Sequence, residues 1–186
     1  MPLHRPHRPL VAALALALLA GCGGPPPAKY YYYPAWGFSV AMPSPPTVTE
    51  TPASPSVTPN IKVSDEAGSD DFSVYAADLP PSAPKDIDQL ADLAAPAVAK
   101  SLGGEVGTRT YAATVQTTNQ AMGREITIDK DGQPILTLRI YLVGNRIYQL
   151  AASTDSGPAA KAFLDSFTIL AGAPASTAAP GATNAD

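Results

Sequence analysis

The segment from Leu136 to Ala151 constrains the fold more than any other, because its pattern predicts a β-hairpin. Leucine and isoleucine alternate with other residues up to Val143, then Gly144-Asn145 intervenes and a second extended stretch follows. Glycine accepts positive φ without a Cβ penalty, so this dipeptide favours a two-residue turn of the primed type. The turn would set two cross-strand pairs: Leu142 opposite Ile147, and Tyr141 opposite Tyr148. Since neither face is fully polar, the hairpin predicts a sheet that is at least partly covered on both sides.

Several shorter segments have the composition of further strands. Gly123 to Ile128 would precede the hairpin, with an Asp-Gly turn signal at residues 129–132 between them. Trp36 to Met42 places alternate apolar side chains on one side, and Phe72 to Tyr75 is expected to form another strand. Residues 43–59 are rich in Pro, Ser and Thr, so only short edge strands are expected there.

Two segments have helical spacing. From Asp86 to Leu102 the apolar residues recur at intervals of three and four, and Gly103-Gly104 supplies a C-terminal stop. Pro96 lies inside this segment, and proline costs about 3 kcal/mol in a helix interior, so a kink or a break is expected there. A second helix is expected from about Pro158 to Asp165, because proline is favoured in the first turn.

The N-terminal residues 1–21 have the order of a bacterial lipoprotein signal peptide. Basic residues come first, an apolar stretch from Leu10 to Ala20 follows, and small residues precede Cys22. The apolar stretch is too short to span a bilayer, which needs about 20 apolar residues. Leu19-Ala20-Gly21-Cys22 resembles the lipobox, in which the cysteine receives diacylglycerol and cleavage occurs before it. We therefore expect a mature chain that begins at Cys22 and is anchored to a membrane by acyl chains.

The expected anchor also suggests a location and a domain organisation. Gly23 follows the cysteine where an Asp commonly signals inner-membrane retention, so an outer-membrane position facing the periplasm is expected. Residues 22–29 would form a Pro/Gly linker with an extended conformation. The globular domain would occupy residues 30–170. Residues 171–186 are rich in Ala, Pro and Thr and are expected to be disordered.

Signal cleavage would remove reactive side chains from the protein. The two histidines, His4 and His7, lie in the signal, and Cys22 is the one cysteine. Of the 186 residues, the 165 that follow the first 21 would therefore lack histidine and a free thiol. This excludes a Ser-His-Asp triad, a Cys-His pair and a His/Cys metal site, and no cofactor or metal is expected. Without Arg5 and Arg8 the formal net charge changes from -4 to -6, which disfavours nucleic acid as a partner.

Five segments occur in a recognisable order: Trp36-Gly37-Phe38-Ser39-Val40, Ser101-Leu102-Gly103-Gly104, Gly123-Arg124-Glu125, Arg139 to Leu150, and Phe163-Leu164-Asp165-Ser166-Phe167. In this order they resemble the PsbP-like superfamily, which includes PsbP and DcrB-like bacterial lipoproteins. The resemblance implies an α+β fold with a central antiparallel β-sheet flanked by helices on both faces, an α/β/α sandwich. It implies binding or assembly rather than enzymatic activity, and no catalytic motif transfers from the family.

Three functions remain open from the sequence. The favoured one is a non-enzymatic, lipid-anchored module that binds an unidentified protein partner in the bacterial envelope. The second is a carrier for a small apolar ligand or lipid, held between sheet and helix and lined by aromatic residues such as Phe38. The third is a carboxylate-based hydrolase, although acid-base catalysis needs a pair of carboxylates held across a cleft. The acidic residues available to a hydrolase are Asp65, Glu66, Asp70 and Asp71.

A candidate binding surface combines aromatic and basic side chains of the expected strands. Its residues are Trp36, Arg139, Tyr141 and Tyr148. Aromatic residues at strand spacing more often belong to a core, so the three aromatic residues also suit the interior of the domain. Tyr30 to Tyr33 could lie at a lipid interface or bind a partner, but they are expected to pack on the first strand. Arg124 and Arg139 could bind an anion, but pairing with acids such as Glu125 is expected.

Overall fold

The computed structural model describes residues 28–65, 72–115 and 121–170. Cys22, the predicted signal peptide, most of the predicted linker and the predicted C-terminal tail lie outside these ranges. Three of the four residues of the acidic cluster, Glu66, Asp70 and Asp71, also lie outside them. The predictions made for these residues therefore remain predictions.

The described residues form strands, two α-helices and two short 3-10 helices. In chain order these are β1 (Lys29–Tyr33), η1 (Pro34–Trp36), β2 (Phe38–Met42), β3 (Pro46–Thr51), β4 (Asn60–Asp65), β5 (Phe72–Asp78), α1 (Ile87–Leu102), β6 (Glu105–Val115), β7 (Ala121–Lys130), β8 (Gln133–Val143), β9 (Arg146–Ser153), η2 (Thr154–Ser156), α2 (Pro158–Ser166) and β10 (Thr168–Ile169).

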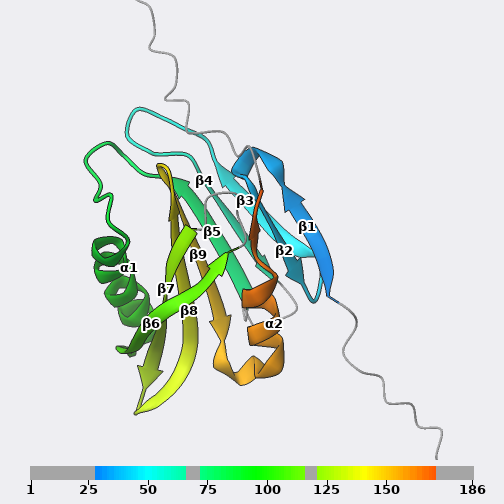
Figure 1. Cartoon of the computed structure of the whole chain (residues 1–186), viewed down its shortest axis with the longest axis vertical. Helices are drawn as coiled ribbons and strands as arrows, with labels where there is room; N and C mark the ends of the chain where they lie inside the picture. The colour runs from blue at the N-terminus through cyan, green and yellow to red at the C-terminus, as the bar shows by residue number, and fades with distance from the viewer. Residues whose placement is uncertain (1–27, 66–71, 116–120, 171–186) are drawn as a thin grey trace, which may run out of the picture.

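The strands belong to two antiparallel sheets (Figure 1). The large sheet has seven strands in the order β3-β4-β5-β9-β8-β7-β6, and the small sheet has three in the order β1-β2-β10. The predicted antiparallel pairing is confirmed throughout the described residues. The large sheet is the predicted central antiparallel sheet, and a second sheet, which the sequence did not indicate, forms from the first strands and the last one.

The hairpin predicted from residues 136–151 is confirmed as the centre of the large sheet. It is formed by β8 and β9, with Leu142 opposite Ile147 and Tyr141 opposite Tyr148. Gly144 has a φ of 59°, which agrees with the conformation expected from the turn. The Asp-Gly signal is also confirmed: β7 turns into β8 through Asp131 and Gly132, whose φ values are 52° and 73°.

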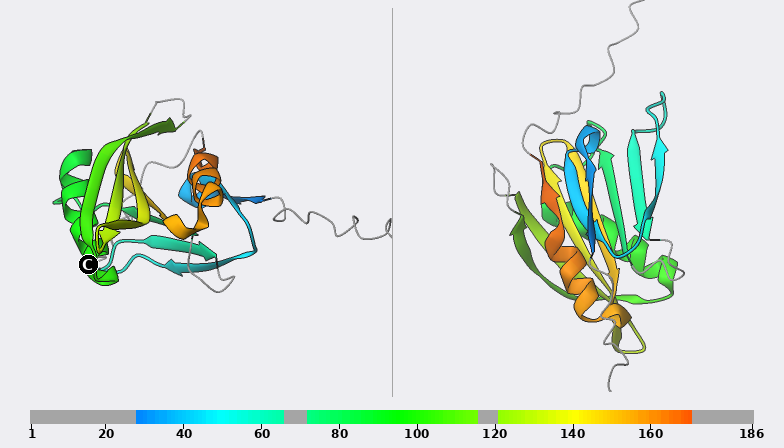
Figure 2. Two further views of the ribbon diagram at one scale, coloured as in Figure 1. Left: turned by 90° about the horizontal axis from the view of Figure 1, so that it is seen from below. Right: turned by 90° about the vertical axis from the view of Figure 1, so that its right-hand side faces the viewer.

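The two faces of the large sheet carry separate apolar clusters, and adjacent residues of the hairpin point to opposite ones. On one face, α1 packs against side chains such as Ile126, Leu138 and Ile140. On the other face, Tyr148 and Leu150 pack together with residues of the small sheet and of α2. Figure 2 shows α1 on one side of the large sheet and the small sheet with α2 on the other. The fold is therefore mixed but mostly sheet.

Both helices form close to their predicted ends. In α1, the Asp86 carboxylate accepts hydrogen bonds at the N-terminus, and Gly103 ends the helix with a φ of 66°. The helix is continuous from Ile87 to Leu102, so Pro96 does not break it. Pro96 is exposed, which keeps its ring off the packed face. In α2, Pro158 is the first residue and Gly157 is the N-cap.

Three local features differ from the sequence-based expectations or extend them. The sequence predicts Trp36 at the start of a strand, but it ends η1, and Gly37 with a φ of 70° separates it from β2. The strand β6 is not among the predicted strands, although its Thr, Val and Tyr content favours extended structure. Residues 43–59 behave as predicted, because the strand that forms there, β3, is short and lies at the edge of the large sheet.

None of the helices formed by the described residues combines the length and the apolar composition needed to cross a membrane.

Candidate functional site

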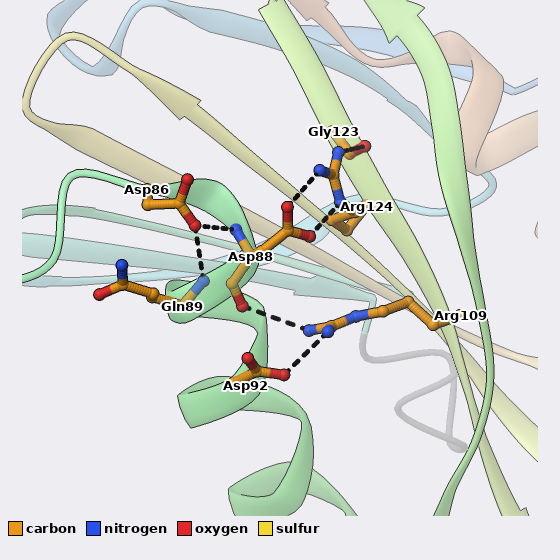
Figure 3. Close-up of polar contacts among 7 residues, drawn as sticks. All are labelled: Asp86, Asp88, Gln89, Asp92, Arg109, Gly123 and Arg124. Carbon is orange, nitrogen blue, oxygen red and sulfur yellow. Dashed lines mark hydrogen bonds and ion pairs between the residues drawn. The ribbon is translucent and has the colours of Figure 1, made fainter.

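The N-terminal half of α1 is fixed to the large sheet by polar contacts (Figure 3). Asp86 is the N-cap of the helix, and its carboxylate accepts hydrogen bonds from the backbone N–H groups of Asp88 at 2.9 Å and Gln89 at 3.0 Å. These bonds satisfy two of the free N–H groups that every helix start leaves. The first turn of α1 is therefore well defined, and it presents Asp88 to the sheet.

Two arginines of the sheet hold this helix by its acidic side. Arg124 of β7 donates two hydrogen bonds to the Asp88 carboxylate, from Nε at 2.5 Å and from Nη2 at 2.6 Å. Arg109 of β6 donates to Asp92 at 2.8 Å and to the backbone carbonyl of Asp88 at 3.3 Å. The hydrogen bonds from Arg124 lower the pKa of the Asp88 carboxyl. Asp88 and Asp92 are one turn apart, so both arginines bind the same side of α1.

Arg109 and Arg124 hold α1 on the side of β6 and β7, and a groove lies along the opposite side of the helix. The helix contacts β6, β7 and β8 most extensively, so the neighbouring part of the sheet, on β5 and β9, is less covered. A cavity of about 290 Å³ lies there. We call it the α1 groove. Its principal lining residues are Leu90, Leu93 and Ala94 of α1, and Tyr75, Ala77 and Ile147 of the sheet.

The central hairpin holds in place a loop that lines the α1 groove. Leu79 and Pro80 of this loop are among the lining residues. The Leu79 N–H donates to the backbone oxygen of Asn145 at 2.7 Å, and the Asn145 side-chain amide donates to the Leu79 oxygen at 2.6 Å. Lys85 also donates to the Asn145 side chain. The residue that forms the hairpin turn therefore also fixes the edge of the groove.

The α1 groove combines apolar side chains with a few polar ones. Its lining is mainly apolar. Thr58, Tyr75 and Gln149 supply hydroxyl and amide groups, and Asp78, which is paired with Arg146, supplies a carboxylate. Burial raises the pKa of the Tyr75 phenol, so this group is a neutral donor or acceptor at physiological pH. Leu93, which also lines the groove, is 64% exposed. The arrangement can accept an apolar side chain and orient it with a few hydrogen bonds.

A comparison with solved structures identifies the fold. The chain is similar to the solution structure of cyanobacterial PsbP (CyanoP) from Synechocystis sp. PCC 6803, with a TM-score of 0.50. The similarity covers 81% of this chain and 98% of that chain. The fold is PsbP-like. Sequence identity is 13%, so the likeness concerns the fold alone. No protein-family model and no curated protein matches the sequence.

Within the PsbP-like fold, the four residues of the predicted binding surface are all buried. Tyr141 and Tyr148 are each 1% exposed, Arg139 is 7% exposed and Trp36 is 9% exposed. The three aromatic side chains belong to the cluster between the two sheets. Burial raises the pKa of both tyrosines. These residues belong to the core, so little of their surface is accessible to a partner in this conformation.

Both arginines considered as anion binders are paired with acids, as expected. Arg139 donates to Glu125 at 2.5 Å and to Asp165 of α2 at 2.8 Å. Burial alone would lower the pKa of Arg139, but its hydrogen bonds to Glu125 and Asp165 outweigh that effect, and the pKa is raised. Arg124 is bound to Asp88 as described above. Both guanidinium groups fasten a helix to the large sheet.

Sequence reasoning missed a third buried arginine that is paired with an acid. Arg146 of β9 donates to Asp78 of β5 at 2.7 Å and to the Ala35 carbonyl at 3.3 Å. Its guanidinium also lies 5.0 Å from the centre of the Trp36 ring. The sequence places Arg146 directly after the hairpin turn, but nothing in it indicates that Asp78 would be opposite.

Of the four acidic residues considered for a hydrolase, Asp65 is the one that the structure describes. Asp65 is buried at the end of β4 and accepts a hydrogen bond from Ser44. Across the three described ranges, no group of three or more His, Cys, Asp and Glu side chains is placed to hold a metal ion. The carrier hypothesis is also modified, because Phe38 lies in the core between the sheets and the α1 groove is on the opposite face of the large sheet.

Proposed function

We propose that this protein is a non-enzymatic lipoprotein of the bacterial envelope whose α1 groove binds an apolar segment of a protein partner. The observation that carries the proposal is the α1 groove itself, a cavity of about 290 Å³ with an exposed leucine at its rim. An apolar side chain that enters it would be removed from water, which stabilises a complex by about 1.5–3 kcal/mol for a residue such as Leu or Phe.

The proposed location follows from the N-terminal sequence. Acyl chains on Cys22 would anchor the chain, and Gly23 favours the outer membrane with the domain facing the periplasm. The predicted mature sequence supports a binding role, because it has no histidine or free thiol with which to build the common nucleophilic sites. Replacing Cys22 with serine is expected to move the protein from the membrane fraction to the soluble fraction.

The shape of the α1 groove favours a protein segment over a small ligand. Small-molecule pockets typically have volumes of about 300–1,000 Å³ and enclose most of the ligand. The α1 groove is at the lower limit of that range and is open beside Leu93. A side chain projecting from a partner surface fits such an opening, whereas a free apolar ligand would keep part of its surface in water.

Two leucines of the same helix provide the test. Leu93 lies at the groove and Leu102 lies at the C-terminal end of α1, and both are exposed, at 64% and 41%. Membranes containing the tagged full-length protein would be crosslinked, and the products of the wild type, Leu93→Glu and Leu102→Glu would be compared. Placing a carboxylate at the groove is expected to weaken binding roughly tenfold or more, while Leu102→Glu retains the crosslinked product.

A crosslinked product that survives Leu93→Glu would contradict the proposal, and so would its equal loss in both variants. If no protein is crosslinked but the purified wild type carries an apolar small molecule that Leu93→Glu loses, the groove serves a carrier instead.

A further inference from the structure

The strand β1 separates its tyrosines into two sets. Tyr31 and Tyr33 are half-buried and pack against the core between the sheets. Tyr30 and Tyr32 point the other way and are 52% and 66% exposed. This is the alternation that a strand imposes on successive side chains. The expectation of a packed aromatic segment therefore accounts for only one side of the strand.

The exposed pair lies on the outer face of the small sheet. Tyr30 is opposite Ala41 and Tyr32 is opposite Ser39 in the pairing of β1 with β2. Although Ser39 and Ala41 are small, they are only 4% and 6% exposed. The two tyrosines thus lie beside small residues, in an edge strand whose one neighbour within the described sheet is β2. In Figure 1, β1 lies at the margin of the molecule opposite α1.

This face has a charge unlike that of the whole chain. The full sequence has a formal net charge of -4, with 16 acidic residues. No Asp or Glu occurs in β1, η1, β2 or β10, and the one charged residue of these four elements is Lys29. Two acidic residues that contact elements next to the small sheet are engaged with other side chains: Glu50 accepts from the Trp36 indole, and Asp165 is paired with Arg139 and Lys161.

The predicted anchor brings this face close to a membrane. Ala28, the first described residue, is six residues from Cys22. An extended chain spans at most about 3.6 Å per residue, so Ala28 lies within roughly 22 Å of an anchored cysteine. The N-terminal end of β1 is therefore restrained near the headgroup layer, whereas the rest of the domain can be farther away.

We infer that Tyr30 and Tyr32 form a surface that lies on the lipid headgroups and orients the anchored domain. Tyrosine favours the membrane interface because its ring is apolar and its hydroxyl remains hydrated. No Asp or Glu of β1 or β2 opposes the approach of this surface to anionic headgroups. The contact would turn the opposite side of the molecule, which carries α1 and its groove, away from the bilayer. This inference rests on the proposed lipid anchor at Cys22.

Tryptophan substitution in the full-length lipidated protein provides the test. Tyr30→Trp and Tyr32→Trp would be reconstituted separately into vesicles of phosphatidylcholine and phosphatidylglycerol, with and without lipids brominated near the headgroup end of the acyl chain. Tyr111→Trp is the matched control, because Tyr111 is 77% exposed but lies on β6. The wild type supplies the background of Trp36, which is 9% exposed.

Bromolipid quenching, after subtraction of the wild-type signal, is expected to be at least about twofold greater for the Tyr30 and Tyr32 variants than for the Tyr111 variant, since only an interfacial ring approaches the acyl chains. Equal quenching in all three variants overturns the inference. Protection of the Tyr30 and Tyr32 variants from a water-soluble quencher without bromolipid quenching also overturns it, and would indicate pairing of β1 with a second copy of the chain.

Vesicle flotation distinguishes the two levels of the proposal. Wild-type protein that floats with the vesicles, together with Cys22→Ser protein that does not, supports the anchor independently of any tyrosine contact. If the wild type does not float, the anchor is contradicted and the inference fails with it. If it floats and the quenching is equal, only the tyrosine surface fails.

Discussion

At the scale of single residues, Gly123 shows how closely the core is packed. It lies opposite Tyr141 in the pairing of β7 with β8. A Cβ at this position would be 2.4 Å from a ring carbon of Tyr141 and 2.9 Å from the Ile140 oxygen. The absence of a side chain at Gly123 therefore makes room for the Tyr141 ring, which stacks on Phe167 in the same core.

We expect Gly123→Ala to lower the free energy of unfolding by about 1–3 kcal/mol, because the added methyl group overpacks this contact. Urea denaturation monitored by circular dichroism would measure the loss. The same substitution should cost less in a Tyr141→Leu background, since the flat ring is then absent. A cost that is identical in both backgrounds would refute the steric explanation.

At the scale of elements, the ends of α1 could be predicted and its attachment could not. Asp86 and Gly103 mark the two ends in the sequence because capping is a local property of the chain. The bidentate contact of Asp88 with Arg124 joins residues 36 positions apart. Which basic residue would meet this carboxylate depends on the register of β7, which the helix sequence does not specify.

The lowered pKa of Asp88 predicts acid sensitivity of the α1 attachment. A carboxyl whose pKa is lower in the folded state stabilises the fold fully above its unfolded value, for which 3.8 is the reference. This contribution is lost as the pH falls below 3.8 through the folded-state pKa. The urea midpoint of Asp88→Asn should therefore depend less steeply on pH than that of the wild type between about pH 4 and 2.5.

The matched control is Asp92→Asn. The Asp92 carboxylate is 67% exposed and bound to Arg109 at 2.8 Å, so it belongs to the same side of the helix in a more hydrated position. Its pH profile should follow the wild type more closely than that of Asp88→Asn does. If the Asp88→Asn profile is parallel to the wild type, Arg124 does not stabilise the charged form in solution.

At the scale of the whole molecule, the two sheets share one core. Phe38 of the small sheet packs on Tyr148 of the large sheet and on Phe167, with ring centres 6.0 and 5.7 Å apart. Polar contacts reinforce the junction: the Tyr148 hydroxyl donates to the Trp36 carbonyl at 3.0 Å, and Arg146 reaches the Ala35 carbonyl. The sheets should therefore unfold together.

Removing the partner of Arg146 tests this junction. Asp78 and Arg146 have side chains that are each 10% exposed, so Asp78→Ala would leave a buried cation without its carboxylate. We expect a loss of about 3–5 kcal/mol, and a smaller loss in the double variant with Arg146→Met. Lys161→Ala, which removes an exposed helix pair, should cost less than about 1 kcal/mol.

Trp36 fluorescence and circular dichroism should report one transition for each variant of this set, because Trp36 lies at the junction and the backbone signal comes from the whole domain. Two separate transitions in the wild type would show that the sheets unfold independently, and would contradict a shared core.

The sequence by itself determined the local structure. The turn at Gly144-Asn145 fixed the register of β8 and β9, because a two-residue turn leaves one pairing for the residues beside it. The ends of both helices followed from capping residues and proline in the same way. The sequence also determines that the tyrosines of β1 point alternately to its two sides, since Tyr30 to Tyr33 occupy consecutive positions of an extended segment.

Only the tertiary structure decided which segments meet. The second sheet forms because β2 pairs with β10, which is more than 120 residues farther along the chain, and no local pattern indicates that contact. The candidate residues Trp36, Tyr141 and Tyr148 became core for the same reason. The α1 groove depends on how Arg109 and Arg124 place the helix across the sheet. Local propensity decides whether a segment forms a helix or a strand. Which distant element then covers its apolar side depends on how all the elements pack together, and a local sequence pattern does not specify this packing.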